Sequence, residues 1–270
     1  MRFDWYQATI PVHPIALVDA LLADMAPDGQ VIPGAGRHNY HQSFTINGAD
    51  GHRVALVLAG GPNGHPNATS SGPATDAFVQ SVRSRWPSHN VTRFDAAEDF
   101  CAEGVWDELE PACRAVASAR GVKGRSIVPD DPADGRTYYM GAPSSNVRVR
   151  LYEKTAELRR SLPQSRWHEV PDNVVRLECQ VRPLKLFKGF AATVQPDQAW
   201  GFAGWTTELA LKAMSLEVQR IEMKAGRESD DERAWRFMLK QYGALLRRQA
   251  AEVGSWECLG LNIREDLDRM

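Results

Sequence analysis

The sequence predicts an α+β fold, built from helices and a sheet with one apolar and one polar face. Strand patterns in which apolar and polar residues alternate occur at 91–96, 146–154 and 173–182. Between and around them, apolar residues recur at helical spacing, as in residues 14–25 and 106–120. Because each strand is apolar on one side only, the sheet should have a core side and a working side.

The composition is that of an ordinary globular protein. The chain has 270 residues, of which 43% are hydrophobic and 24% are charged, enough for one large core or two small ones. We therefore expect a single domain over residues 1–270, with a two-lobed arrangement of 1–130 and 131–270 as the alternative. The net charge of −2 excludes a global basic field. Residues 136–188 nevertheless hold 11 Lys and Arg against 5 Asp and Glu, a local net charge of +6.

The four cysteines give no sign of a disulfide framework or a zinc site. They are Cys101, Cys113, Cys179 and Cys258, far apart and without a CxxC pair. No signal segment is apparent, and no apolar run approaches the ~20 residues that a membrane span needs. These features predict a cytoplasmic protein with reduced thiols and no membrane partner.

The first half of the chain predicts alternating strands and helices. We expect a strand over 3–10, a helix over 14–25, and two strands over 40–46 and 53–58 around a turn. The Gly- and Pro-rich segments before residue 40 and over 60–72 are expected to be loops. A helix over 73–86 ends at Pro87, and a helix over 106–120 ends at Gly121.

The central segment predicts a hairpin with a basic face. Strands over 136–140 and 146–154 flank the small-residue turn 141–145. Val147, Val149 and Leu151 point to one face. The opposite face carries Arg148, Arg150 and Tyr152. Guanidinium groups in a row suit a phosphate backbone, although a solvated hairpin face has the same pattern.

Two further strands carry Arg together with carboxylates on their polar faces. Residues 91–96 place Arg93 and Asp95 on one face, with Asp99 following. Residues 173–182 are the third strand of this kind, with polar residues Arg176, Glu178, Gln180 and Arg182. If the strands share a sheet, these side chains converge, and several carboxylates would repel one another unless a cation lies between them.

Glu153 does not fit the alternation of its strand. It falls on the apolar face together with Leu151. A carboxylate in that position is costly unless it is paired or bound to a metal, or the strand ends there.

The three segments, in this order, resemble the replication initiation factors of the Rep-trans type. The family pattern is roughly R-x-D-x-x-x-D, then G-R-T-x-Y-x-G-S-x-x-S-x-x-x-R-x-Y-E-K, then R-x-E. The first and last parts fall on Arg93, Asp95 and Asp99, and on Arg176 and Glu178. The middle part falls on Gly135, Arg136, Thr137, Tyr139, Gly141, Ser145, Arg150, Tyr152, Glu153 and Lys154. The resemblance extends over residues 4–259, and residues 241–243 resemble the filamentous-phage branch.

The resemblance implies a fold and an activity. The fold would be a central antiparallel sheet with helices packed on one face and a polar catalytic face on the other, similar to rolling-circle initiator endonucleases. The activity would be initiation of rolling-circle DNA replication, by metal-dependent nicking of single-stranded origin DNA and strand transfer. A tyrosine would form a covalent 5′-phosphotyrosyl intermediate. The implied partners are single-stranded or supercoiled origin DNA, with host helicase and polymerase as further candidates.

The resemblance also assigns site residues. A divalent cation, Mg²⁺ or Mn²⁺, would be held by Asp95, Glu153 and Glu178, with Asp99 as a substitute or outer ligand. The candidate DNA-binding residues are Arg93, Arg136, Arg148, Arg150, Lys154, Arg176 and Arg182.

The nucleophile is left open among three tyrosines. The segment 183–192, where plasmid initiators carry a tyrosine, has none here. Tyr139 and Tyr152 lie on the central hairpin, and Tyr242 lies on an expected helix over 231–253. Tyr242 also belongs to an apolar stripe, so it could simply pack in a core. A long helix is expected over 206–224, and a short element over 256–263.

Two other functions fit the same residues. A DNA-binding regulator or origin-binding protein without nicking activity would use the same basic hairpin. A phosphodiesterase that attacks with water would use the same carboxylates and leave no covalent adduct.

Overall fold

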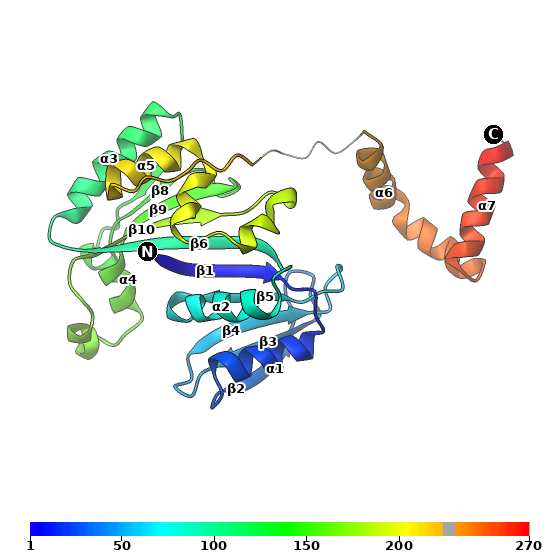
Figure 1. The fold of residues 1–270 in the computed structure, drawn as a ribbon, viewed down its shortest axis with the longest axis horizontal. Coiled ribbons are helices and arrows are strands. Elements are labelled where there is room, and N and C mark those ends of the chain that lie inside the picture. Colours follow the sequence, from blue (N-terminus) through cyan, green and yellow to red (C-terminus); the bar gives the residue numbers. More distant parts are fainter. Residues whose placement is uncertain (224–229, 270) are drawn as a thin grey trace. The chain divides into compact units, whose positions relative to one another are not determined.

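The computed structural model describes residues 1–223 and 230–269, and its strands form one large sheet. The strands are β1 (Arg2–Thr9), β2 (Gln30–Ala35), β3 (Gln42–Asn47), β4 (Arg53–Ala59), β5 (Asn67–Ser71), β6 (Asn90–Cys101), β7 (Gly124–Ile127), β8 (Thr137–Met140), β9 (Val147–Glu153) and β10 (Val174–Val181). Their order in the sheet is β2-β3-β4-β5-β1-β6-β10-β9-β8-β7, and every neighbouring pair is antiparallel. Figure 1 shows β1 and β6 side by side in the middle of this sheet.

The helices divide between two compact units of the chain, Met1–Ala225 and Gly226–Met270. The first unit holds the sheet and α1 (Pro14–Met25), α2 (Thr75–Arg85), α3 (Val105–Ala119), α4 (Lys154–Arg160) and α5 (Gly204–Met214). The second unit holds α6 (Asp230–Glu252) and α7 (Trp256–Arg269). The chain therefore divides near residue 225, whereas the sequence offered a division near residue 130.

The sheet consists of two halves with the same topology. The first half runs β1-α1-β2-β3-β4-β5 and has the spatial order β2-β3-β4-β5-β1. The second half starts β6-α3-β7-β8-β9, ends with β10, and has the matching order β7-β8-β9-β10-β6. The halves meet where β1 pairs with β6, with Trp5 opposite Asp95. The first strands of the two halves share a tripeptide, Arg2-Phe3-Asp4 in β1 and Arg93-Phe94-Asp95 in β6.

One hydrophobic core lies between the sheet and its helices. Apolar residues at helical spacing, such as Leu17, Phe78 and Trp106, pack against strand residues such as Phe94 and Leu177. In β9 the alternation holds, because Val147, Val149 and Leu151 belong to this core. The predicted α+β class, with an antiparallel sheet and helices on its core side, is confirmed.

The sequence missed three strands and overestimated one helix. β2 contains Pro and Gly, β5 reads Asn-Ala-Thr-Ser-Ser, and β7 has four residues, so none shows an apolar alternation. The helix expected over 206–224 ends at Met214, because Ser215 adopts a left-handed conformation with φ of 51°. The short element expected over 256–263 is the longer helix α7.

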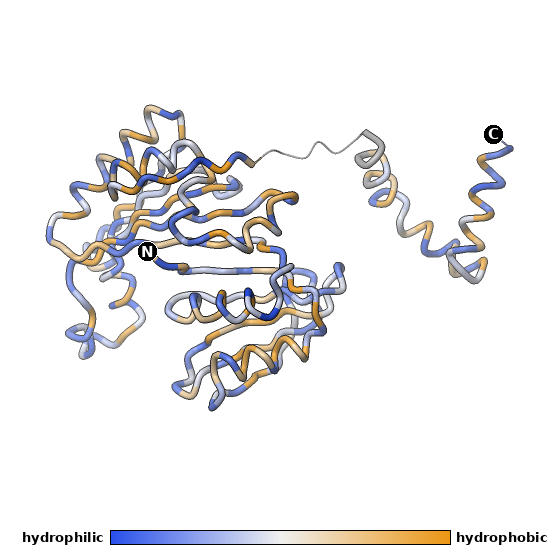
Figure 2. Tube along the Cα trace, viewed as in Figure 1, coloured by the Kyte–Doolittle hydropathy of each residue, from blue (hydrophilic) through white to orange (hydrophobic). Residues whose placement is uncertain are grey.

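The two helices of the second unit have mixed hydropathy (Figure 2). Hydrophobic and hydrophilic residues are interleaved along α6 and α7 (Figure 2). Within residues 1–223 and 230–269, no helix is long and apolar enough to cross a membrane.

Candidate functional site

The polar residues of the second half gather around a pocket on the open face of the sheet. The pocket has a volume of about 290 Å³. Its charged lining residues are Asp4, Asp95, Glu178, Arg93, Arg148, Arg150 and Arg182. These side chains come from β1, β6, β9 and the end of β10, which lie next to one another in the sheet. The sheet thus brings together most of the residues that the strand alternation placed on its working side.

Asp95 and Glu178 form the acidic centre of the pocket. The strand register puts Asp95 opposite Gln180 and Glu178 opposite Ala97, so the two carboxylates are diagonal neighbours on β6 and β10. Asp95 is only 1% exposed. Its carboxylate accepts a hydrogen bond from Arg93 Nε at 2.9 Å and a second one from Arg93 Nη2.

These surroundings raise the pKa of Asp95. Burial penalises the charged carboxylate and raises its pKa most strongly. The Arg93 guanidinium lowers the pKa, while the negative charge of Glu178 raises it again. The result is a pKa of about 7 for Asp95. A carboxyl group in this state is poised between its neutral and charged forms near neutral pH.

This pKa predicts a pH-dependent stability for the metal-free protein. The unfolded chain loses the Asp95 proton near the ordinary aspartate pKa of 3.8, whereas the folded protein keeps it until about pH 7. Raising the pH from about 4 to 7 therefore disfavours the folded state, by on the order of 1–4 kcal/mol. We expect the stability of Asp95→Asn relative to the unmodified protein to rise across this window in EDTA, as measured by urea unfolding. A pH-independent difference would contradict the raised pKa.

Arg150 connects Glu178 to the central hairpin. Its Nη2 donates to Glu178 Oε2 at 3.1 Å, and its guanidinium lies 3.7 Å from the centre of the Tyr152 ring. Arg148 stacks in the same way on Tyr139, at 4.0 Å. The hairpin therefore presents two stacked Arg–Tyr pairs on the open face, as expected for a surface that binds a polyanion.

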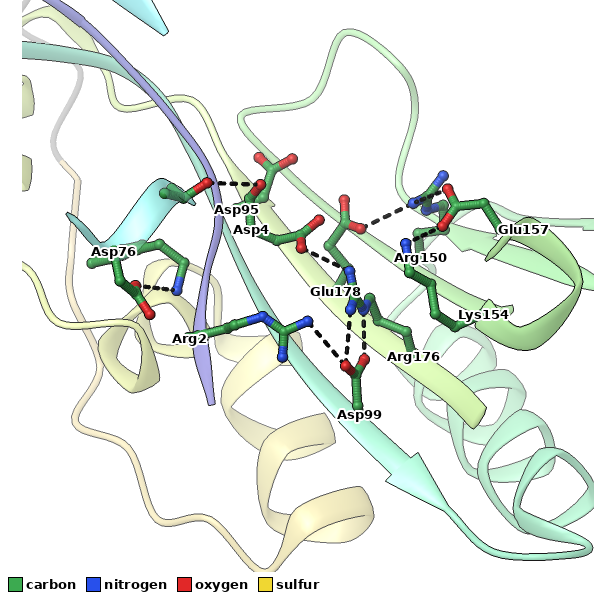
Figure 3. Close-up of polar contacts among 12 residues, drawn as sticks. Arg2, Asp4, Asp76, Asp95, Asp99, Arg150, Lys154, Glu157, Arg176 and Glu178 are labelled. Atoms are coloured by element: carbon green, nitrogen blue, oxygen red, sulfur yellow. Dashed lines mark hydrogen bonds and ion pairs between the residues drawn. The ribbon is translucent and has the colours of Figure 1, made fainter. Parts of the chain in front are cut away.

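Arg176 serves a structural network instead of lining the pocket. It is 4% exposed and donates from Nε and Nη2 to Asp99, at 2.5 and 2.8 Å. Its Nη1 donates to Asp4 Oδ1 at 2.7 Å, and Arg2 also binds Asp99, at 3.0 Å (Figure 3). Burial alone would raise the pKa of Asp99, but the two guanidinium groups hold it below its usual value. Asp99 is thus an ion-pair partner of two arginines.

Glu153 does not line the pocket that holds Asp95 and Glu178, so its role as a third metal ligand stays a prediction. Its carboxylate accepts from the Arg136 backbone N–H at 2.5 Å and from Arg136 Nη2 at 2.8 Å. Leu151, two residues earlier, faces the core, and β9 ends at Glu153. The ion pair with Arg136 at the end of the strand therefore offsets the cost of placing the Glu153 carboxylate there. Arg136 and Lys154 are likewise engaged by acids, Lys154 by Glu157.

Of the predicted DNA-binding residues, Arg93, Arg148, Arg150 and Arg182 line the pocket. Burial and the nearby charges of Arg93 and Arg148 lower the pKa of Arg182. Positive charges this close together repel one another, so a bound anion would stabilise the pocket. The remaining three, Arg136, Lys154 and Arg176, lie outside the pocket lining.

The three candidate tyrosines occupy different environments. Tyr139 lines the pocket together with the two carboxylates. Tyr152 is 4% exposed, and burial raises its pKa well above the usual value. Tyr242 lies on α6 of the second unit and is 47% exposed. Tyr139 is therefore the tyrosine that the described part of the first unit places at the carboxylate site.

Asp4 and Trp5 also line the pocket, and sequence reasoning missed both. Trp5 carries Arg93 on its ring at 4.5 Å. The repeated Arg-Phe-Asp tripeptide at 2–4 and 93–95 is a signal that could have identified Asp4, since it marks equivalent positions in the two halves.

The donor atoms of the pocket suit a hard divalent cation. Within the described residues, no group of three His, Cys, Asp or Glu side chains is close enough to enclose a metal ion. Two adjacent carboxylates are nevertheless what Mg²⁺ sites commonly use, with water and substrate phosphate supplying the other ligands. Burial is the main cause of the raised pKa of Asp95 and the charge of Glu178 adds to it, so a cation between the two carboxylates would relieve their repulsion.

The fold is similar to a solved structure described as the rolling circle replication initiator protein from Geobacillus stearothermophilus. The similarity has a TM-score of 0.52, covers 86% of this chain and 89% of that chain, and comes with 18% sequence identity. No family model and no curated protein matches the sequence. The comparison establishes the fold, and the predicted likeness to rolling-circle initiators is confirmed at that level. The Rep-trans type and the filamentous-phage branch stay predictions.

Proposed function

We propose that this protein initiates rolling-circle DNA replication by nicking single-stranded origin DNA and holding the cut strand covalently. The observation that carries the proposal is the pocket on the open face of an initiator fold, where Asp95 and Glu178 lie among four arginines. Arginines in this number bind phosphates, and the carboxylate pair can hold the cation that phosphoryl transfer needs.

The proposed reaction is an attack by a tyrosine on phosphorus. The phenolic oxygen forms a bond to the scissile phosphate, and the bond from phosphorus to the 3′ oxygen breaks. The tyrosine loses its proton, and the leaving oxygen gains one to become the 3′-hydroxyl that primes synthesis. The product is a 5′-phosphotyrosyl bond, whose energy is retained for the later strand transfer.

The side chains of the pocket have separate roles in this proposal. Arg148, Arg150 and Arg182 hold the DNA phosphates, and Trp5 offers a ring on which an unpaired base can stack. Asp95 and Glu178 would hold Mg²⁺ or Mn²⁺, with Asp4 beside them. When bound, this ion polarises the scissile phosphate. Origin DNA is the proposed partner, with host helicase and polymerase as further candidates.

Tyr139 is the nucleophile that we propose, because it lines the pocket with the carboxylates. Tyr139→Phe should abolish nicking, a loss of at least about 1,000-fold, because no other hydroxyl takes its place. The measurement is cleavage of labelled single-stranded DNA from the source replicon with Mn²⁺, on a denaturing gel. Tyr138→Phe is the matched control, since Tyr138 is buried in the core on the other face of the sheet. Unchanged nicking by Tyr139→Phe would leave Tyr152 and Tyr242 as the candidate nucleophiles.

A DNA-binding regulator is the second candidate function. It is favoured by the ion pairs that already neutralise Asp95 and Glu178, with Arg93 and Arg150 respectively. In this alternative the carboxylates order the arginines for phosphate binding and no bond is cut. Tight binding of origin DNA that stays intact with Mn²⁺ would establish it.

A further inference from the structure

A second pocket adjoins the first on the open face of the sheet. Its volume is about 390 Å³, and Tyr139 and Arg150 line both pockets. Beyond these two shared residues, its lining includes Tyr152, Glu157 and Arg160. The two pockets therefore lie next to each other along β8 and β9. The side chains of Tyr139 and Arg150 lie between them.

Two buried hydrogen-bond donors at this second pocket lack acceptors. The Tyr152 hydroxyl and the Arg150 Nε have no hydrogen-bond partner among the residues that the structure describes. Both belong to one stack, because the Arg150 guanidinium lies 3.7 Å from the Tyr152 ring centre. Native proteins seldom leave buried donors unsatisfied, so an acceptor from outside the chain is indicated.

The charges around the pocket permit an anionic acceptor. Its acidic lining residues are already paired, Glu153 with Arg136 and Asp134 with Arg160. Glu157 is paired with Lys154. An entering phosphate would consequently meet neutralised carboxylates and two free donors.

Arg150 connects the second pocket to the first. Arg150 reaches Glu178 of the first pocket, and Tyr152 follows two residues later on the same strand.

We propose that the second pocket binds the DNA phosphate next to the scissile one, through the Tyr152 hydroxyl and Arg150 Nε. This inference rests on the proposed function, and it makes Tyr152 a residue that positions the strand and does not attack it.

The test is binding of single-stranded DNA by Tyr152→Phe in EDTA, where no cleavage occurs. Fluorescence anisotropy would be measured with a labelled 16-nucleotide strand of the source replicon. A series of the same strand would carry a neutral methylphosphonate at each successive position. We expect Tyr152→Phe to weaken binding about 10- to 150-fold, since it removes one hydrogen bond to a charged group. That difference should vanish when the methylphosphonate replaces the neighbouring phosphate.

Two further measurements keep the inference separable from the proposed function. Tyr138→Phe is the control, and its binding should equal that of the unmodified protein. Tyr152→Phe should be at least as stable as the unmodified protein without DNA, because its hydroxyl has no partner within the described chain. Unchanged DNA binding, or a loss of stability, would overturn the inference while nicking by the unmodified protein still supported the function. Failure of the unmodified protein to bind any of the strands would overturn both.

Discussion

Glu178→Gln is expected to reduce the rate of nicking by at least about 100-fold while DNA binding persists. The amide keeps the shape of the side chain and can still accept the hydrogen bond from Arg150. It loses the negative charge that a divalent cation requires, and ligand losses of this kind commonly cost two orders of magnitude or more. The measurement is the single-turnover nicking rate at saturating DNA and Mn²⁺, with the Kd for the same strand measured in EDTA.

Glu98→Gln is the matched control for this experiment. Glu98 lies on β6 opposite Leu177, and its carboxylate pairs with the amino terminus at 2.5 Å. The same chemical change there should leave the nicking rate within about twofold, since Glu98 does not line the pocket. If Glu178→Gln nicked DNA as fast as this control, the result would contradict a role of the carboxylate pair in the reaction.

Arg176→Gln is expected to destabilise the folded protein by about 3–5 kcal/mol. The substitution leaves Asp4 without its guanidinium and Asp99 with Arg2 alone, in a buried part of the sheet. Breaking a buried ion pair costs this much because the Asp4 carboxylate, which is only 18% exposed, loses the cation that Arg176 supplies. The free energy of unfolding in urea measures the effect.

Arg2→Gln provides the comparison, because Arg2 binds the same Asp99 from a side chain that is 38% exposed. Exposed ion pairs contribute at most about 1 kcal/mol, so this variant should be nearly as stable as the unmodified protein. Adding Asp4→Asn and Asp99→Asn to Arg176→Gln should recover part of the loss. Equal destabilisation by Arg176→Gln and Arg2→Gln would contradict the buried network.

The strands with strict alternation could be predicted because their two faces meet different surroundings. β9 and β10 each pack one face in the core and carry polar residues on the other face. The resulting alternation of apolar and polar residues is visible in their sequences. β5 lies between β4 and β1 and is held by pairing with both, so Asn-Ala-Thr-Ser-Ser forms a strand without any apolar pattern. The end of α5 at Ser215 depends on a single left-handed residue, which periodicity cannot reveal.

The candidate site could be predicted in part for the same reason. Asp95, Glu178 and Arg150 meet because alternation fixed their face and the sheet order placed β6, β10 and β9 together. The motif grouped Glu153 with these residues, but in the structure Glu153 forms an ion pair with Arg136. That ion pair depends on the register between β8 and β9, which the sequence alone does not reveal. Asp4 comes from β1, and only the pairing of β1 with β6 brings it to Asp95.

The most direct test of the central claim is a search for a covalent protein–DNA adduct. The protein would be incubated with labelled single-stranded DNA of the source replicon and Mn²⁺, digested, and examined by peptide mass analysis. We predict a 5′-phosphotyrosyl adduct on Tyr139, the tyrosine that lines the carboxylate pocket. Cleaved DNA without any adduct would contradict tyrosine attack and indicate hydrolysis by water. Intact DNA would contradict nicking itself.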